Sequence, residues 1–284
     1  MSKHDKPAVV ANPWRTLGQF TDARIGLGRA GVSLPTSKLL EFQLAHARAR
    51  DAVHFPLQVD RLINDLGQEP AIAALGQPIC LQSRAADRLT YLQRPDLGRQ
   101  LCPSSQSDLA QNSADGQPAD LSIALVDGLS PTAVQQHAAP FLATLLPVLR
   151  DATTLKHWRL APLALVEQGR VAIGDEIGAS LNARVMVVII GERPGLSAPD
   201  SLGVYLTYEP KVGKHDAQRN CLSNIRPRGL DFHQASQKLA YLLSEADQMA
   251  TSGVALKDRT ETADALDTHH NASAKHTNFL VPGS

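Results

Sequence analysis

The feature that most limits how this 284-residue chain can fold is an uninterrupted run of six apolar residues, Val185–Ile190. Such a run favours a strand that is buried on both faces of a sheet. It lies within Gly169–Leu196, which places an amphipathic segment before the run and a polar loop with glycine and proline after it. The same alternation predicts strands at 121–126, 160–167, 183–191 and 204–209, and helices at 132–149, 172–181 and 231–244. Apolar strands separated by helices predict an α/β fold with a mostly parallel sheet.

Changes in composition divide the chain into five predicted segments. Residues 103–119 are rich in Ser, Gln, Asp and Pro, so we expect a boundary segment there, followed by a Rossmann-like sheet domain over 120–250. We expect residues 23–102 to form a smaller, mainly helical N-terminal region, with its first helix beginning at Pro35 and Thr36. Residues 1–22 read as an extended arm, and the polar, aperiodic residues 251–284 as a disordered tail. The apolar face of the first helix is predicted at Leu39, Leu40, Phe42, Leu44, Ala45 and Ala49.

The composition argues against several classes of function. Lys and Arg total 28, as do Asp and Glu, so the chain lacks the basic excess typical of nucleic-acid binding. Its longest apolar run is far too short for a membrane span. The three cysteines lack CxxC spacing, and the N-terminal residues lack the apolar core of a secretory signal. We therefore expect a cytoplasmic protein that binds neither nucleic acid nor membrane.

Ligands of open α/β sheets bind beyond the carboxyl ends of the strands, which here selects three segments. They are Asp127–Ser130, Gly191–Leu196 and the loop near Cys221. We interpret Asp127–Ser130 mainly as the N-cap of the following helix. The charged pair after the most apolar strand, Glu192 and Arg193, is expected at the ligand edge, at an interface or in an exposed loop salt bridge. Residues 219–228 are expected to form a basic, polar loop that serves as an anion site or an interface, with Cys221 as a buried structural cysteine in the simplest case.

Two patterns that suggest other chemistry lack the context they need. Gly26, Gly28 and Gly31 spell GxGxxG, but the preceding residues do not form the buried strand that a dinucleotide site requires. We interpret them as a turn that leads into a helix. The ten histidines form neither HxxxH nor HExxH, and we expect no metal site and no catalytic residues in this chain. A DxHxxG motif, which donates a histidine to cobalt in one class of cobalamin proteins, is also absent.

Six motifs in order resemble the small subunit of adenosylcobalamin-dependent ethanolamine ammonia-lyase. The resemblance runs from about Arg24 to about Leu243, and its motifs are GRAG, LTYLQRPDLGRQL, VDGLS, GRVAIGDEIG, GERPGL and CLSNI. It implies a subunit that helps to bind adenosylcobalamin for the radical deamination of ethanolamine to acetaldehyde and ammonia. Substrate and radical would lie in a barrel-type large subunit, with which this chain would form a hetero-oligomer of paired subunits. The small-subunit cobalamin contacts of the family carry over to Val171, Glu192 and Cys221.

Other functions remain as alternatives. One is a stand-alone α/β binding module that uses the same edge for a nucleotide or a flavin, and another is a purely structural partner of an enzyme. Some members of the resembled family carry a longer N-terminal segment that targets a protein shell, and this chain begins too close to the matching motifs to hold one. We therefore expect cytoplasmic localisation, with packaging in a bacterial microcompartment as the alternative.

Overall fold

A computed structural model describes residues 9–10, 12–21, 23–112 and 117–257. Within these residues the main sheet has six strands, β3 (Ile79–Gln82), β4 (Ala119–Val126), β5 (Ala164–Glu167), β6 (Ala183–Gly191), β7 (Leu202–Tyr208) and β8 (Arg219–Ile225). Their order is β3-β5-β4-β6-β7-β8. The pairs β3–β5, β5–β4 and β4–β6 are parallel, whereas β7 runs antiparallel to both of its neighbours. The predicted α/β fold with a mostly parallel sheet is therefore confirmed.

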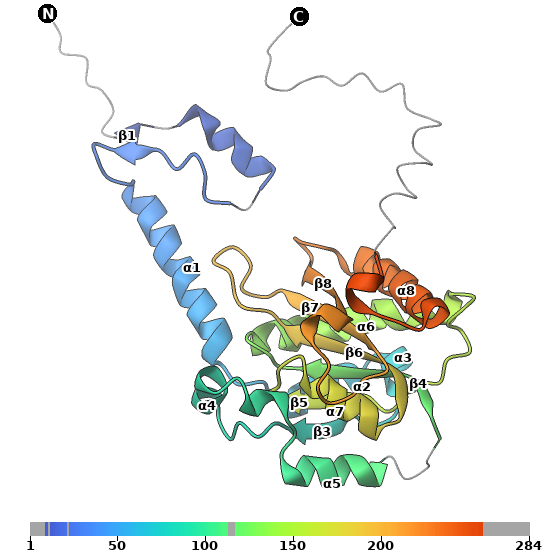
Figure 1. The fold of residues 1–284 in the computed structure, drawn as a ribbon. Coiled ribbons are helices and arrows are strands. Elements are labelled where there is room, and N and C mark those ends of the chain that lie inside the picture. The colour runs from blue at the N-terminus through green and yellow to red at the C-terminus, as the bar shows by residue number, and fades with distance from the viewer. Residues whose placement is uncertain (1–8, 11, 22, 113–116, 258–284) are drawn as a thin grey trace, which may run out of the picture.

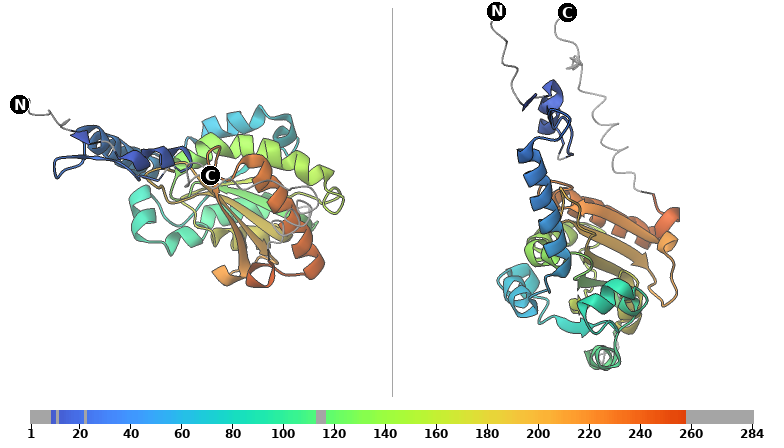
Figure 2. Two further views of the ribbon diagram at one scale, coloured as in Figure 1. Left: turned by 90° about the horizontal axis from the view of Figure 1, so that it is seen from above. Right: turned by 90° about the vertical axis from the view of Figure 1, so that its left-hand side faces the viewer.

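Helices cover both faces of this sheet (Figures 1 and 2). They are α1 (Thr36–His54), α2 (Val59–Gly67), α3 (Pro70–Ala73), α4 (Arg88–Gln93), α5 (Pro103–Asn112), α6 (Pro131–Asp151), α7 (Ile173–Ser180) and α8 (Phe232–Met249). Side chains along β6 alternate between two apolar cores: Val185, Val187 and Ile189 pack with α6 and α8, while Met186, Val188 and Ile190 pack with α7. This alternation explains why the strand is apolar at every position.

The first long helix extends away from the sheet, as Figure 1 shows in blue. It begins at Thr36, as predicted, and Ala52 is its buried residue. Its predicted apolar face is not buried, because Leu39, Leu40, Phe42 and Leu44 keep 42–58% of their surface exposed. Before this helix lie a 3-10 helix over Pro13–Gln19 and a small antiparallel pair of β1 (Val9–Val10) with β2 (Arg29–Ala30). Residues 13–19 are therefore helical, where an extended arm was expected.

The structure differs from the sequence-based expectation at three further places. Residues 219–225 form strand β8, whereas we expected a loop. The expected boundary at 103–119 contains helix α5, and β3 before it belongs to the same sheet as the strands after it, so the division into domains remains only a prediction. The first residues of the expected tail, Thr251–Lys257, pack on the fold through buried Leu256, and residues 258–284 lie outside the described part. None of the described helices has the length and apolar character of a membrane span.

Candidate functional site

Two tight turns meet at the carboxyl ends of β4 and β6. Gly128, with φ +60°, follows β4, and the next residue, Leu129, donates its backbone N–H to the Gly191 carbonyl over 2.9 Å. A Cβ at Gly128 would collide with the backbone of Gly191, and a Cβ at Gly191 would collide with the turn at Ser130. Glycine at both positions therefore lets the two turns pack directly against each other. We call the surface that Gly128, Leu129 and Gly191 form together the floor of the site. Ser130 caps α6, as predicted, by accepting from the Ala133 N–H over 3.2 Å.

A pocket of about 440 Å³ opens above this floor. Its walls come from α4, the turns after β4 and β5, the end of β6, and the strands β7 and β8. The lining residues are Tyr91, Leu129, Arg170, Val171, Ile190, Gly191, Glu192, Arg193, Tyr205 and Ser223. A hollow of about 320 Å³ adjoins it and shares Arg170, Val171 and Tyr205. Two of the three predicted cofactor contacts, Val171 and Glu192, thus line one pocket at the predicted edge.

Glu192 uses its carboxylate to join β6 to β8. Its Oε1 accepts from the Ser223 hydroxyl over 2.7 Å, and its Oε2 accepts from the Asn224 N–H over 3.1 Å. Both donors belong to exposed residues, so the carboxylate stays at the surface of the pocket. An ionised carboxylate offers about four acceptor positions, which leaves room for donors from a ligand.

The third predicted contact, Cys221, lies on β8 directly opposite Tyr205 on β7. Cys221 is exposed, and the Tyr205 hydroxyl lies within hydrogen-bonding reach of its thiol. Loss of surrounding water raises the pKa of the thiol, the hydrogen bond from Tyr205 lowers it, and the Glu192 carboxylate raises it again, with a net increase. The thiol is therefore protonated at neutral pH, and Cys221 is not the buried structural cysteine of the simplest interpretation.

A buried polar cluster, formed by Asp127 and Arg88, contacts the turn after β4. Asp127 is 1% exposed, accepts from the Gly169 N–H over 3.2 Å and lies 3.7 Å from Arg88 Nη1. Burial raises the pKa of Asp127 to about 6, although the hydrogen bonds from the backbone and the Arg88 charge oppose this shift. The same Arg88 atom donates to the Gly128 carbonyl over 2.8 Å, so the cluster fixes the turn after β4.

Several residues of the site escaped the sequence analysis. Tyr91 and Arg170 lie within two of the quoted motifs, but nothing local marks them as neighbours. Arg219 and Asp175 form a buried bidentate ion pair, with N···O distances of 2.6 and 2.7 Å. This pair ties the start of β8 to α7, and it joins residues 44 positions apart in the sequence.

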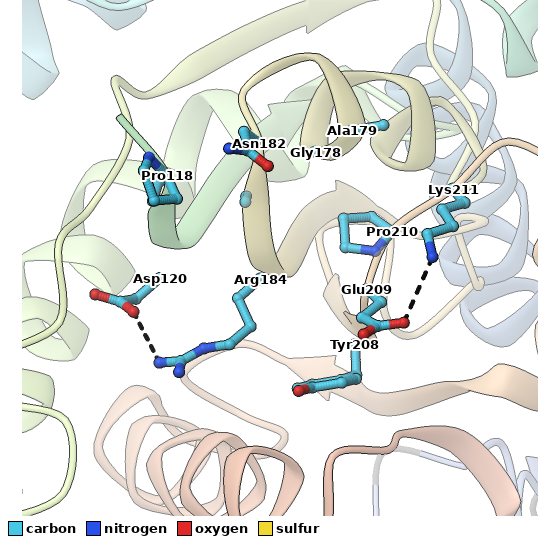
Figure 3. Close-up of a pocket in the computed structure, with 12 residues that line it drawn as sticks. Pro118, Asp120, Gly178, Ala179, Asn182, Arg184, Tyr208, Glu209, Pro210 and Lys211 are labelled. Carbon is cyan, nitrogen blue, oxygen red and sulfur yellow. Dashed lines mark hydrogen bonds and ion pairs between the residues drawn. The ribbon is translucent and has the colours of Figure 1, made fainter. Parts of the chain in front are cut away.

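A second hollow, of about 550 Å³, lies at the opposite end of the strands (Figure 3). Its charged groups are largely paired with each other: Arg184 contacts Asp120 over 2.8 Å and Asp247 over 3.2 Å, and Lys211 lies 3.6 Å from Glu209. We therefore place the candidate site at the carboxyl-end edge. Across the residues that the structure describes, no group of three or more His, Cys, Asp or Glu side chains could hold a metal ion.

Comparison with known proteins agrees with the motifs. The family described as ethanolamine ammonia-lyase light chain matches residues 11–257. A protein of Azotobacter vinelandii named ethanolamine ammonia-lyase small subunit is 52% identical over 98% of both chains. Proteins of the same name from Pseudomonas aeruginosa and Pseudomonas syringae pv. tomato are 51% and 47% identical, over 98% and 100% of this chain and 98% and 96% of their own lengths. The chain therefore belongs to the family of ethanolamine ammonia-lyase light chains.

Proposed function

We propose that this chain is the small subunit of an adenosylcobalamin-dependent ethanolamine ammonia-lyase and supplies one side of the cofactor site. The observation that carries the proposal is the pocket at the carboxyl ends of the strands. It gathers Val171 and Glu192, which are 21 positions apart, beside the strand that holds Cys221. Nearly full-length identity of about half to relatives of that name supports the same function.

The residues of this edge fit the chemistry of cobalamin. The cofactor is a broad macrocycle with an apolar rim and many amide side chains, so it needs apolar contact together with acceptors for N–H groups. Val171 offers an apolar surface, Glu192 offers free acceptor positions, and the neutral Cys221 thiol is a small, weakly polar contact. The two adjoining hollows, of about 440 and 320 Å³, can seat one side of such a molecule but cannot enclose it. A cofactor shared with a second subunit is consistent with this shape.

In this proposal the chain binds and orients the cofactor and performs no bond cleavage itself. Cobalamin supplies the organic radical that starts the deamination when it is bound. Val171 would offer apolar contact to the corrin rim, Glu192 would accept hydrogen bonds from its amides, and the Gly128–Gly191 floor would limit the depth of the site. Substrate and the reacting atoms belong to the large subunit.

The exposed side of α1 supports a large partner. Four large apolar residues, Leu39, Leu40, Phe42 and Leu44, keep 42–58% of their surface exposed along this helix. Several large, exposed apolar side chains on one helix are typical of interaction sites. We propose that the large subunit covers it.

The test is acetaldehyde release from ethanolamine by this chain, by the large subunit and by their mixture, each with adenosylcobalamin. Only the mixture should be active. Activity of this chain alone with the cofactor would refute the subunit assignment. The alternative, a nucleotide or flavin module, lacks support from the GxGxxG motif, because Gly26 and Gly28 lie in a loop with no described strand directly before it. Binding of a dinucleotide that Gly26→Ala abolishes would favour that alternative.

A further inference from the structure

Arg170 is a closely held cation that lines both hollows of the candidate site. Its backbone N–H donates to the Gly98 carbonyl over 2.7 Å, and its Nη2 donates to the Tyr91 carbonyl over 3.1 Å. Its guanidinium lies over the Tyr91 ring, 4.1 Å from the ring centre. A Cβ at Gly98 would approach the Arg170 side chain to 2.9 Å, so glycine there makes room for it. Two contacts with Tyr91 thus fix the side chain between the two adjoining hollows, and a backbone hydrogen bond fixes its main chain.

These contacts leave the charge of Arg170 uncompensated. Within the described residues it forms no ion pair with a carboxylate, and its buried Nε has no hydrogen-bond partner. Arg88, whose guanidinium lies 4.7 Å from the centre of the same Tyr91 ring, has Asp127 as its counter-ion. Both arginines have one buried nitrogen without a hydrogen-bond partner, so Arg170 differs from Arg88 in having no counter-ion among the described residues.

The surrounding walls are positive as well. Arg99 and Lys214 line the smaller hollow, and Arg193 lines the larger one, again with no ion pair among the described residues. Two carboxylates also lie at these walls: Glu192 accepts from Ser223 and Asn224, and the exposed Asp216 lies 3.7 Å from Arg219. Four cations (Arg99, Arg170, Arg193 and Lys214) against these two carboxylates leave the walls with a net positive charge, which favours an anion.

We propose that Arg170, assisted by Arg99 and Lys214, binds the phosphodiester in the nucleotide loop of cobalamin. This inference rests on the proposed function, because the phosphodiester is the one anionic group among the side chains of the cofactor. A planar guanidinium suits a phosphate because two of its N–H groups can face two oxygens at once. Tyr91 acts as a positioning residue, because its ring and its backbone carbonyl both contact the Arg170 guanidinium.

The test compares adenosylcobalamin with adenosylcobinamide, which lacks the nucleotide loop and its phosphate. Both are titrated into the reconstituted complex of the two subunits, carrying either the native chain or Arg170→Gln. The variant should bind adenosylcobalamin about 10- to 100-fold more weakly and adenosylcobinamide within about twofold of the native complex. Inorganic phosphate should compete with adenosylcobalamin in the native complex and compete less in the variant.

Two further variants keep the result interpretable. Arg170→Lys retains the charge but loses the fork, so its affinity should fall between those of native protein and Arg170→Gln. Arg61→Gln removes an exposed arginine of α2 and should change neither affinity. Equal weakening of both cofactors by Arg170→Gln, or no weakening of either, would overturn the phosphate assignment while leaving the proposed function intact. Failure of the native complex to bind adenosylcobalamin would instead overturn the proposed function itself.

Discussion

Replacing Glu192 with alanine removes two contacts inside the chain and one predicted contact to the cofactor. The internal contacts are the hydrogen bonds from the Ser223 hydroxyl and the Asn224 N–H. Because both donors belong to exposed residues, water replaces the carboxylate, and the free energy of unfolding should fall by only about 1 kcal/mol. The cofactor loses an ionised acceptor for its amides, which should weaken its binding by about 1–3 kcal/mol, or roughly 5- to 150-fold.

Glu192→Gln separates shape from charge at the same position. The amide can accept from Asn224 and donate to the Ser223 oxygen, so both internal contacts persist and cofactor affinity should fall only mildly. Glu209→Ala, at the opposite end of the sheet in Figure 3, is the matched control and should leave affinity unchanged. The assay is titration of the reconstituted complex with adenosylcobalamin and, separately, with ethanolamine. An unchanged cobalamin constant together with a raised ethanolamine constant in Glu192→Ala would refute the placement of this residue.

Three further predictions concern two buried carboxylates, Asp127 and Asp175, and the exposed apolar residues of α1. The folded-state pKa of Asp127, about 6, lies above its ordinary value of 3.8, so its stabilising contribution is greatest at low pH and is lost as the pH rises to about 6. The unfolding free energy of the native chain relative to Asp127→Asn should therefore fall by about 2 kcal/mol between about pH 4.5 and pH 7 in denaturant titrations, and a rise would contradict this sign. Asp175→Asn removes the buried carboxylate that pairs with Arg219 and leaves only the exposed Asp216, at 3.7 Å. It should lower stability by about 3 kcal/mol in urea titrations, whereas a loss below about 1 kcal/mol would show that the pair contributes little. Leu40→Glu on α1 should weaken association with the large subunit without changing the melting temperature of the isolated chain, and unchanged association would move the interface elsewhere.

The sequence predicted the parts of the fold that rest on continuous apolar runs. Strand β6 begins and ends at the predicted residues 183 and 191, because it is buried on both faces. Strand β8 was missed because its buried residues, Arg219, Leu222 and Ile225, recur every three positions, which does not match the period of a strand. An irregular register against β7 accommodates this spacing: Leu222 pairs with Val204 and Ile225 with Leu202. Local periodicity carries no sign of such a shift.

Local sequence patterns are limited in the same way at the candidate site, because they do not show contacts between distant residues. Val171 and Glu192 were located through motifs and lie at the predicted edge, but the role of these residues stays a prediction. The contact of Arg170 with Tyr91 joins residues 79 positions apart, and no pattern near either residue indicates it. The exposed face of α1 was misjudged for a related reason, because an amphipathic pattern predicts a buried face without telling whether this chain or another covers it.

The central claim is that the cofactor lies between this edge and the large subunit. It is tested most directly by an electron cryomicroscopy map of the two-subunit complex with adenosylcobalamin. We predict that the corrin contacts Val171, Glu192 and Cys221, with the nucleotide-loop phosphate beside Arg170. A map in which the large subunit alone encloses the cofactor, or in which the cofactor lies at the opposite hollow of Figure 3, would contradict the claim.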